Sequence, residues 1–162
     1  MKHVSVKEIM ISPEDYLTVN ELDTVKDAIQ KLQSSFSLDE KGVTRGHTSI
    51  LVTNPSGKLV GILTIRGILK ALMMHEKGKE FPSNYLWTLF VTKSYESAEE
   101  IPVRQIMKDR KVFSIGPDDE IMKAVEMIVD NKVNTLPVVE NGKPVGIIRA
   151  KDIFSKIGYI MD

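Results

Sequence analysis

The feature that most constrains this chain of 162 residues is an internal repeat. The motif VKEIM at residues 6–10 returns as VRQIM at 103–107, and GKLVGI at 57–62 returns as GKPVGI at 142–147. An apolar pattern at helical spacing also recurs, with Val25, Ala28, Ile29 and Leu32 corresponding to Ile121, Ala124, Val125 and Ile128. Two copies of one supersecondary unit predict a pseudo-twofold body with equivalent clefts at its seam.

Each copy is predicted to run helix, strand, helix, strand, strand, helix. Short β-rich runs lie at 49–53 and 59–64 in the first copy and at 136–140 and 144–149 in the second. The last two are joined by Asn141-Gly142, the strongest short signal for a β-hairpin. So few strands cannot bury both faces of a sheet in one copy alone. We therefore expect an α+β fold in which the two units pack sheet to sheet about a pseudo-twofold axis.

The sequence suggests three segments. We expect the first repeat over residues 1–72, a helical inter-repeat segment over 73–102 and the second repeat over 103–162. The first copy carries extra residues at 36–47, whose small and charged side chains predict an exposed loop. An apolar run at 85–91 predicts a helix with a spare apolar face, and from it we expect a homodimer.

The composition excludes several classes of function. Lysine plus arginine and aspartate plus glutamate both number 22, so no overall positive field favours nucleic acid or an anionic membrane. The chain has no cysteine, and no apolar run approaches the roughly 20 residues of a membrane span. The three histidines lack metal-ligand spacing, and no catalytic set can be assembled from them. We expect a cytoplasmic, soluble protein without a metal site that is not an enzyme.

The ordered set of these motifs, present twice, resembles the cystathionine-β-synthase (CBS) domain, whose tandem pair is called a Bateman module. The resemblance covers about residues 4–72 and 103–158. It implies a stand-alone regulatory pair that binds an adenine nucleotide or related adenosyl ligand between the repeats and signals to a partner protein. The implied ligand is AMP, ADP or ATP, with NAD or S-adenosylmethionine as alternatives. The other possibility is an interaction module whose clefts stay empty.

The resemblance also implies site residues. In the family, a Gly-apolar-x-apolar-Pro run lines the adenine pocket, and a Gly-apolar-apolar-Ser/Thr-x-x-Asp run holds ribose and phosphates, often from opposite repeats. Matched to this sequence, the stronger cleft is expected to comprise Asp152, Arg149, Lys151, Thr48, Ser49 and Ile50. The weaker cleft is expected to comprise Thr64, Arg66, Val133, Asn134, Thr135 and Pro137.

The two copies depart from the family pattern in different places. Arg149 stands at the Ser/Thr position of the second copy, and Gly67 stands at the Asp position of the first. Asp152 alone keeps the carboxylate, so its cleft is expected to bind better. Each candidate also has a structural alternative. Asp152 suits a helix start, where the macrodipole favours negative charge, Arg149 and Lys151 suit a solvated surface, and Pro137 suits the start of a buried strand.

Overall fold

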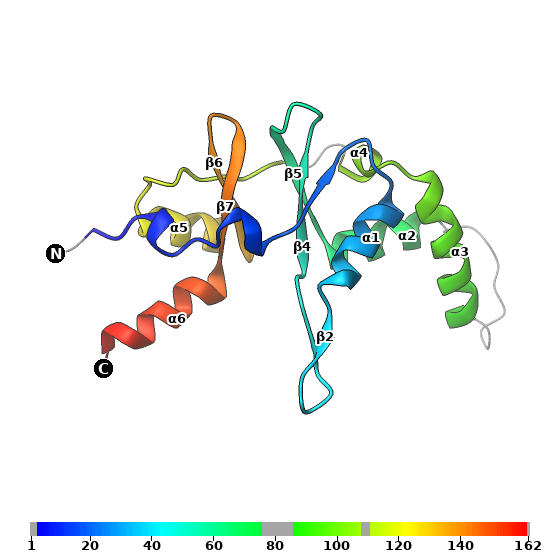
Figure 1. The fold of residues 1–162 in the computed structure, drawn as a ribbon, viewed down its shortest axis with the longest axis horizontal. Coiled ribbons are helices and arrows are strands. Elements are labelled where there is room, and N and C mark those ends of the chain that lie inside the picture. The colour runs from blue at the N-terminus through cyan, green and yellow to red at the C-terminus, as the bar shows by residue number, and fades with distance from the viewer. Residues whose placement is uncertain (1–2, 76–85, 108–110, 162) are drawn as a thin grey trace. The chain divides into compact units, whose positions relative to one another are not determined.

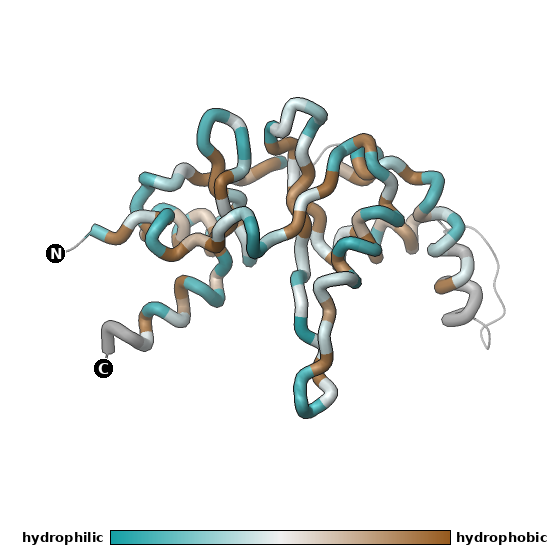
Figure 2. The backbone as a smooth tube through the Cα atoms, viewed as in Figure 1, coloured by the Kyte–Doolittle hydropathy of each residue, from teal (hydrophilic) through white to brown (hydrophobic). Residues whose placement is uncertain are grey.

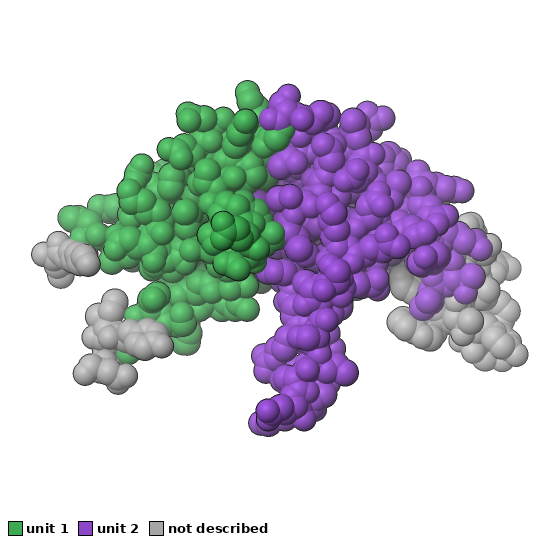
Figure 3. All heavy atoms as spheres, in the orientation of Figure 1, with its two compact units in different colours: residues 1–16, 57–59, 111–162 green, residues 17–56, 60–110 purple. Residues whose placement is uncertain are grey.

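The computed structural model describes residues 3–75, 86–107 and 111–161. The chain divides into two compact units, which Figure 3 shows in green and purple. Unit 1 comprises Met1–Tyr16, Gly57–Leu59 and Lys111–Asp162, and unit 2 comprises Leu17–Ser56 and Val60–Arg110. The boundaries of the compact units thus differ from the boundaries of the sequence repeats. The start of the chain belongs with the second repeat, and the start of the second repeat belongs with the first.

Unit 2 is built on a three-stranded sheet with the strand order β1-β4-β5. Its strands are β1 (Thr18–Asn20), β4 (Ser49–Thr53) and β5 (Leu59–Thr64). Strand β1 runs parallel to β4, with Val19 opposite Val52. Parallel neighbours need a crossover connection, and helix α1 (Val25–Ser34) lies on this connection. Helix α2 (Ile65–His75) follows β5 directly.

Helix α1 is capped at its first turn by Thr24 and Asp27. The Thr24 hydroxyl accepts a hydrogen bond from the Asp27 backbone N–H at 3.2 Å, and the Asp27 carboxylate accepts one from the Thr24 N–H at 2.9 Å. This reciprocal capping box satisfies two backbone donors that the first turn leaves unpaired. The local sequence therefore fixes the start of the helix that covers the sheet.

Two further helices complete unit 2. Helix α3 (Leu86–Glu100) packs against both α1 and α2, and a short helix α4 (Val103–Met107) follows it (Figure 1). The Val25 N–H donates to the Ile101 carbonyl at 2.8 Å, and the Val103 N–H donates to the Asp23 carbonyl at 2.7 Å. These bonds tie the end of α3 and the start of α4 to the start of α1. The predicted apolar helix at 85–91 thus begins at Leu86, while Tyr85 lies outside the described residues.

Unit 1 repeats the plan with a smaller sheet. Strands β6 (Thr135–Glu140) and β7 (Lys143–Arg149) form an antiparallel hairpin, with helix α5 (Ile121–Asn131) before it and α6 (Ala150–Met161) after it. Asn141 and Gly142 have φ values of 52° and 79°. Positive φ at both residues is what a type I′ turn requires, so the predicted hairpin is confirmed.

The third strand expected in the second copy is reduced to one bridge. Ile115 pairs in parallel with Val138: its N–H donates to the Pro137 carbonyl at 3.0 Å, and its carbonyl accepts from the Val139 N–H at 2.8 Å. Gly116 and Pro117 follow at once, and proline cannot donate to a ladder. The pairing therefore stops after one residue. On the other edge, Ile11 forms an antiparallel bridge with Ile147.

The start of each copy is buried in the core of the other copy. Val6, from the short 3-10 helix η1 (Val6–Glu8), joins the core of unit 1 with Leu136 and Ile148, and a second 3-10 helix, η2 (Pro13–Asp15), follows it. Val103, the equivalent of Val6, joins the core of unit 2. Both side chains are 0% exposed. The apolar strand segments through each unit are brown in Figure 2.

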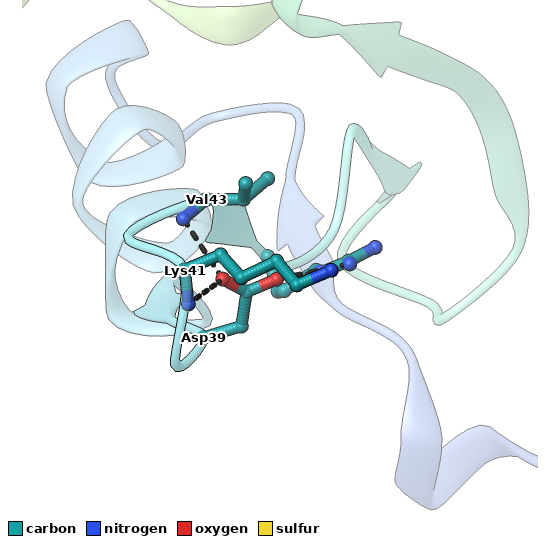
Figure 4. A network of polar contacts seen from close by, with 4 residues as sticks. Asp39, Lys41 and Val43 are labelled. Atoms are coloured by element: carbon teal, nitrogen blue, oxygen red, sulfur yellow. Dashed lines mark hydrogen bonds and ion pairs between the residues drawn. The ribbon is translucent and has the colours of Figure 1, made fainter.

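The insertion at 36–47 is an ordered hairpin where we predicted an exposed loop. Strands β2 (Ser37–Leu38) and β3 (Thr44–Arg45) are antiparallel, and the hairpin projects from unit 2 (Figure 1). Asp39 holds its turn: one carboxylate oxygen accepts from the N–H groups of Lys41 and Val43 at 2.9 Å, and the other accepts from Arg45 at 3.0 Å (Figure 4). The backbone bond from Val43, followed by the charge-assisted bond from Arg45, lowers the pKa of Asp39.

Candidate functional site

The candidate residues of the second copy gather where strand β7 meets helix α6. Arg149, the last residue of β7, donates from Nε to Asp152 Oδ2 at 2.6 Å and from Nη2 to Asp152 Oδ1 at 2.8 Å. Both side chains are mostly buried, at 25% and 21% exposure. Two parallel bonds of this kind fix the carboxylate geometrically and strengthen the ion pair. The structure therefore joins Asp152, the residue predicted to bind ribose, to Arg149, the residue predicted to bind phosphate.

A backbone bond links this junction to the segment before β6. The Ala150 N–H, at the first residue of α6, donates to the Asn134 carbonyl at 2.9 Å. Asn134 is exposed, and Val133 and Thr135 are half-buried beside it. Pro137 is fully buried and lies on the opposite face of β6 from the core residues Leu136 and Val138, because successive strand residues face opposite sides. Residues 133–135 thus lie next to the start of α6.

The first copy builds the equivalent junction in unit 2. The Ile65 N–H, at the first residue of α2, donates to the Thr48 carbonyl at 3.0 Å. The Thr64 hydroxyl accepts from the Gly67 N–H at 3.0 Å and so caps the helix. Thr64 and Gly67 correspond to Arg149 and Asp152. One junction therefore offers a hydroxyl and no carboxylate, whereas the other offers a paired guanidinium and carboxylate.

The remaining candidate residues differ in how much of their side chains is exposed. Thr48 is exposed and Ser49 is half-buried, but the side chain of Ile50 is 1% exposed and belongs to the core of unit 2. Only the backbone of Ile50 can therefore meet a ligand without rearrangement of that core. Arg66 and Lys151 are exposed in the first turns of α2 and α6. Cations there lie beside helix N-termini, where backbone N–H groups favour anions.

The structure brings the candidates together within each unit. Arg149 and Asp152 are joined to residues 133–135 in unit 1, and Thr64 is joined to Thr48 in unit 2. The predicted stronger cleft combined Asp152 of unit 1 with residues 48–50 of unit 2, and this pairing across the units stays a prediction. The same holds for the weaker cleft.

Sequence reasoning identified Arg149 and Asp152 but missed the bond between them. The signal was present: opposite charges stand three residues apart across a strand-to-helix junction. It also missed the two backbone ties, in which the carbonyls of Thr48 and Asn134 accept from the first N–H groups of α2 and α6. No sequence pattern reveals these ties, because every non-proline residue carries the same backbone groups.

A cavity of about 360 Å³ lies elsewhere in unit 2, beneath the helices α1, α2 and α3. Its lining is largely apolar and includes Ile29, Leu32, Ile68 and Leu72. Ser94 of α3 also lines it, is 7% exposed, and has a hydroxyl without a hydrogen-bond partner in the part of the chain that the structure describes. The cavity contains neither of the junction pairs described above.

Two further properties concern only the described residues. They hold no group of three or more His, Asp or Glu side chains that is arranged to bind a metal ion. None of their helices combines the length and the apolar character needed to cross a membrane.

Comparison of the sequence with known proteins identifies its relatives. A family model described as the CBS domain matches residues 6–74 and 103–159. An uncharacterized protein of Methanopyrus kandleri is 24% identical over 162 residues, which cover 99% of this chain and 66% of that protein. The A-adding tRNA nucleotidyltransferase of Aquifex aeolicus is 26% identical over 95% of this chain and 14% of that enzyme. The chain thus spans less than two thirds of the length of either relative.

Solved structures share the fold. A CBS domain-containing protein of unknown function from Bacillus anthracis has a TM-score of 0.72 and 25% identity, covering 96% of this chain and 94% of that one. The protein CBSX2, solved in complex with AMP, has a TM-score of 0.66 and 23% identity, covering 98% of both chains. The CBS domain pair of MJ0100, solved with 5′-methylthioadenosine and S-adenosyl-L-methionine, has a TM-score of 0.67 and 21% identity, covering 98% of this chain and 99% of that one.

Proposed function

Because the chain belongs to the CBS domain family, we propose that it is a regulatory CBS-domain pair that binds an adenine nucleotide or related adenosyl ligand between its repeats. The observation that carries this proposal is the Arg149–Asp152 pair at the start of α6. Two proteins of the same fold are solved with AMP or with adenosyl ligands. Ligand occupancy would then be signalled to a partner protein, so the role is regulation rather than catalysis.

The Arg149–Asp152 pair retains capacity for a ligand. An ionised carboxylate has about four lone-pair sites and a guanidinium has five N–H donors, and the pair uses two of each. Asp152 keeps acceptor positions for the two vicinal hydroxyls of a ribose, and Arg149 keeps donors for a phosphate. Lys151 and the first N–H groups of α6 add positive potential beside it. This combination favours a phosphorylated adenosine: AMP, ADP or ATP before NAD or S-adenosylmethionine.

The two clefts are proposed to be unequal. Asp152, Arg149 and Lys151 would be completed by residues 48–50 of the first copy. The other cleft would combine Thr64 and Arg66 with residues 133–137, and it lacks a ribose carboxylate because Gly67 stands at that position. We expect the second cleft to bind an adenosine ligand more weakly.

The alternative proposal is an interaction module with empty clefts. The observation that favours it is the same ion pair, since Arg149 donates to both carboxylate oxygens of Asp152. The mostly buried charges of Arg149 and Asp152 neutralise each other, so the pair does not need a ligand to compensate them. The choice between the two proposals is therefore a question of measured affinity.

Thermal unfolding with a panel of ligands tests the proposal. AMP, ADP, ATP, NAD and S-adenosylmethionine would each be added at increasing concentration. A ligand at 100 times its Kd stabilises the folded state by about 2.7 kcal/mol, so a binding nucleotide raises the melting temperature in a concentration-dependent way. An unchanged melting temperature with every ligand of the panel at millimolar concentration would support the empty module.

The assembly and location of the protein are also proposals. We expect a homodimer in solution and a cytoplasmic location. Light scattering at about 100 μM, far above the micromolar Kd of a modest interface, gives the mass of a dimer if this is right. A monomer mass at that concentration would contradict it.

A further inference from the structure

A cavity of about 360 Å³ lies among helices α1, α2 and α3 of unit 2, where α3 packs on both of the other helices (Figure 1). Most of its lining residues form a buried group and an exposed group, named here the floor and the rim. The floor consists of Leu32, Ile68, Leu72, Ser94 and Ala98. The rim consists of Gln30, Gln33, Phe36, Leu69, Val91 and Tyr95. The cavity therefore extends from exposed side chains to buried ones.

The size of the cavity is unusual for the space between packed helices. Protein interiors are close-packed, and few of their voids are larger than a water molecule. An apolar cavity of about 150 Å³ is large enough to bind benzene, and the cavity of unit 2 has a volume of about 360 Å³. It therefore suits a molecule of roughly 10–15 non-hydrogen atoms.

Helix α3 contributes a polar group to the floor. The residues of α3 that line the cavity are Val91, Ser94, Tyr95 and Ala98. Their i, i+3, i+4, i+7 spacing places them on one face of the helix, so the Ser94 side chain points toward α1 and α2. Ser94 is 7% exposed, and its hydroxyl has no hydrogen-bond partner among the described residues. Because a buried hydroxyl without a partner destabilises the folded state, a ligand atom that bonds to it would be stabilised there.

The charges at the cavity favour a neutral ligand. Among the described lining residues, Lys26 is the one with a charged side chain. Its ammonium forms an ion pair with Glu99 of α3 and lies 4.6 Å from the centre of the Tyr95 ring. A carboxylate or phosphate on a ligand would have to displace Glu99 or lose its hydration against the apolar floor, and burial of an unpaired charge is costly.

We propose that this cavity binds a neutral, largely apolar molecule of roughly 10–15 non-hydrogen atoms, whose hydroxyl or carbonyl oxygen forms a hydrogen bond with Ser94. A serine hydroxyl both donates and accepts, so either oxygen satisfies it. The aliphatic or aromatic body of the ligand packs on Leu32, Ile68 and Leu72. The site goes beyond the proposed function and does not depend on it, since none of the residues proposed to bind a nucleotide lines the cavity.

The space depends on small side chains of α3. Ser94 and Ala98 stand four residues apart, about one turn of the helix, and both belong to the floor. A larger side chain at either position would occupy the volume that the ligand needs. These two residues therefore provide separate tests, one of the hydrogen bond and one of the space.

The probe is 4-propylphenol, a neutral molecule of about 10 non-hydrogen atoms with one hydroxyl. It is titrated into the full chain, without nucleotide, and the methyl signals of isoleucine and leucine are followed by NMR. Saturable shifts of the methyl signals of Leu32, Ile68 and Leu72 are expected, with a Kd of roughly 0.1–1 mM for a ligand of this size.

Ser94→Ala tests the hydrogen bond. It should weaken binding of the probe by about 3- to 10-fold, the usual range for a hydrogen bond between neutral groups. The matched control is Ser97→Ala, because Ser97 is equally buried on the same helix at 7% exposure but does not line the cavity. This control should bind the probe with the Kd of the parent. Removal of an unpaired hydroxyl does not impair folding, so weaker binding by Ser94→Ala would report the lost bond.

Ala98→Leu tests the space and should weaken binding by about tenfold or more, because its side chain projects into the cavity. Circular dichroism compares each variant with the parent, and Ser94→Ala decides the result if Ala98→Leu does not fold. The proposal would be overturned if the three methyl signals of the parent did not shift saturably with about 5 mM probe, a concentration above the expected Kd. An unchanged Kd in Ser94→Ala, or in a folded Ala98→Leu, would overturn it as well.

Discussion

Arg149 and Asp152 form a two-bonded ion pair across the junction of β7 and α6, with distances of 2.6 and 2.8 Å. The pair unites two residues that differ between the copies of the repeat, since the first copy has Thr64 and Gly67 in their places. It also holds the Asp152 carboxylate in position. Such preorganisation reduces the ordering that binding must otherwise impose.

Replacing Arg149 by threonine, the residue of the first copy, should separate phosphate from ribose recognition. The change removes donors for a phosphate but leaves Asp152 to accept ribose hydroxyls. Loss of a charge-assisted hydrogen bond weakens binding by roughly 1.5–3 kcal/mol, or about 10- to 150-fold. Calorimetry should show this loss for AMP and a much smaller one for adenosine. Equal losses for both ligands would mean that Arg149 acts only by holding Asp152.

Gly146→Ala should destabilise unit 1. A Cβ at this position would lie 2.8 Å from the Ile11 carbonyl oxygen and 2.7 Å from Met10 Sδ, and Ile11 cannot retreat without breaking its bridge to Ile147. Overpacking of this kind costs about 1–3 kcal/mol.

The matched control for Gly146→Ala is Gly158→Ala in α6, where an added Cβ meets nothing within 4 Å. Urea unfolding should show a lower midpoint for Gly146→Ala and an equal or higher midpoint for Gly158→Ala, since alanine is favoured over glycine in helices by up to roughly 1 kcal/mol. Similar midpoints for the two variants would contradict the close approach of Ile11.

Ser94→Ala should stabilise the protein. The Ser94 hydroxyl is buried and has no hydrogen-bond partner among the described residues, and an unsatisfied buried polar group costs about 1–3 kcal/mol. Ser97→Ala is the comparison, because Ser97 is equally buried at 7% exposure but is not without a partner. Thermal unfolding should give a higher melting temperature for Ser94→Ala and a lower one for Ser97→Ala. A lower value for Ser94→Ala would show that its hydroxyl is satisfied in solution.

The capping box of α1 should make part of the stability depend on pH. The backbone N–H of Thr24, followed by its hydroxyl, lowers the pKa of Asp27 below its ordinary value of 3.8. A carboxyl whose pKa is depressed by folding stabilises the protein above its unfolded-state pKa, and this contribution is lost as the pH falls through the folded-state value.

Asp27→Asn should therefore lower the free energy of unfolding at pH 7 by about 1 kcal/mol, the usual contribution of a cap. Urea titrations at several pH values should show the parent and the variant converging as the pH falls through the lowered pKa of Asp27, where the carboxyl of the parent also becomes protonated. If the difference in the free energy of unfolding between parent and variant stays constant as the pH falls, the effect comes from packing rather than from the charge of Asp27.

Local chemistry explains which elements could be predicted from the sequence. The hairpin at Asn141 and Gly142 depends on residues close in the chain, and it is found where it was predicted. The start of α1 at Thr24 is fixed by local residues in the same way. The hairpin of the 36–47 insertion escaped prediction because its strands have two residues each and lack an alternating pattern.

Long-range packing explains what was missed. Nothing in the sequence near Val6 or Val103 shows that each is buried in the core of the other copy, because the same motif would fit either core. The candidate residues at the junctions were found through the family resemblance. The bond between Arg149 and Asp152 was missed although their opposite charges stand three residues apart in the sequence.

Asp152 is proposed to bind the ribose of an adenosine ligand in the better of two unequal clefts. This proposal is tested by isothermal titration calorimetry, in which AMP is added to the parent chain, to Asp152→Ala and to the control Asp130→Ala. The carboxylate of Asp130 is exposed on α5. We predict that Asp152→Ala weakens AMP binding at least tenfold, because it loses a charge-assisted bond worth roughly 1.5–3 kcal/mol. Asp130→Ala should bind AMP with the affinity of the parent. All three proteins should give the same circular dichroism spectrum. Equal affinity for AMP in Asp152→Ala and the parent would contradict the claim.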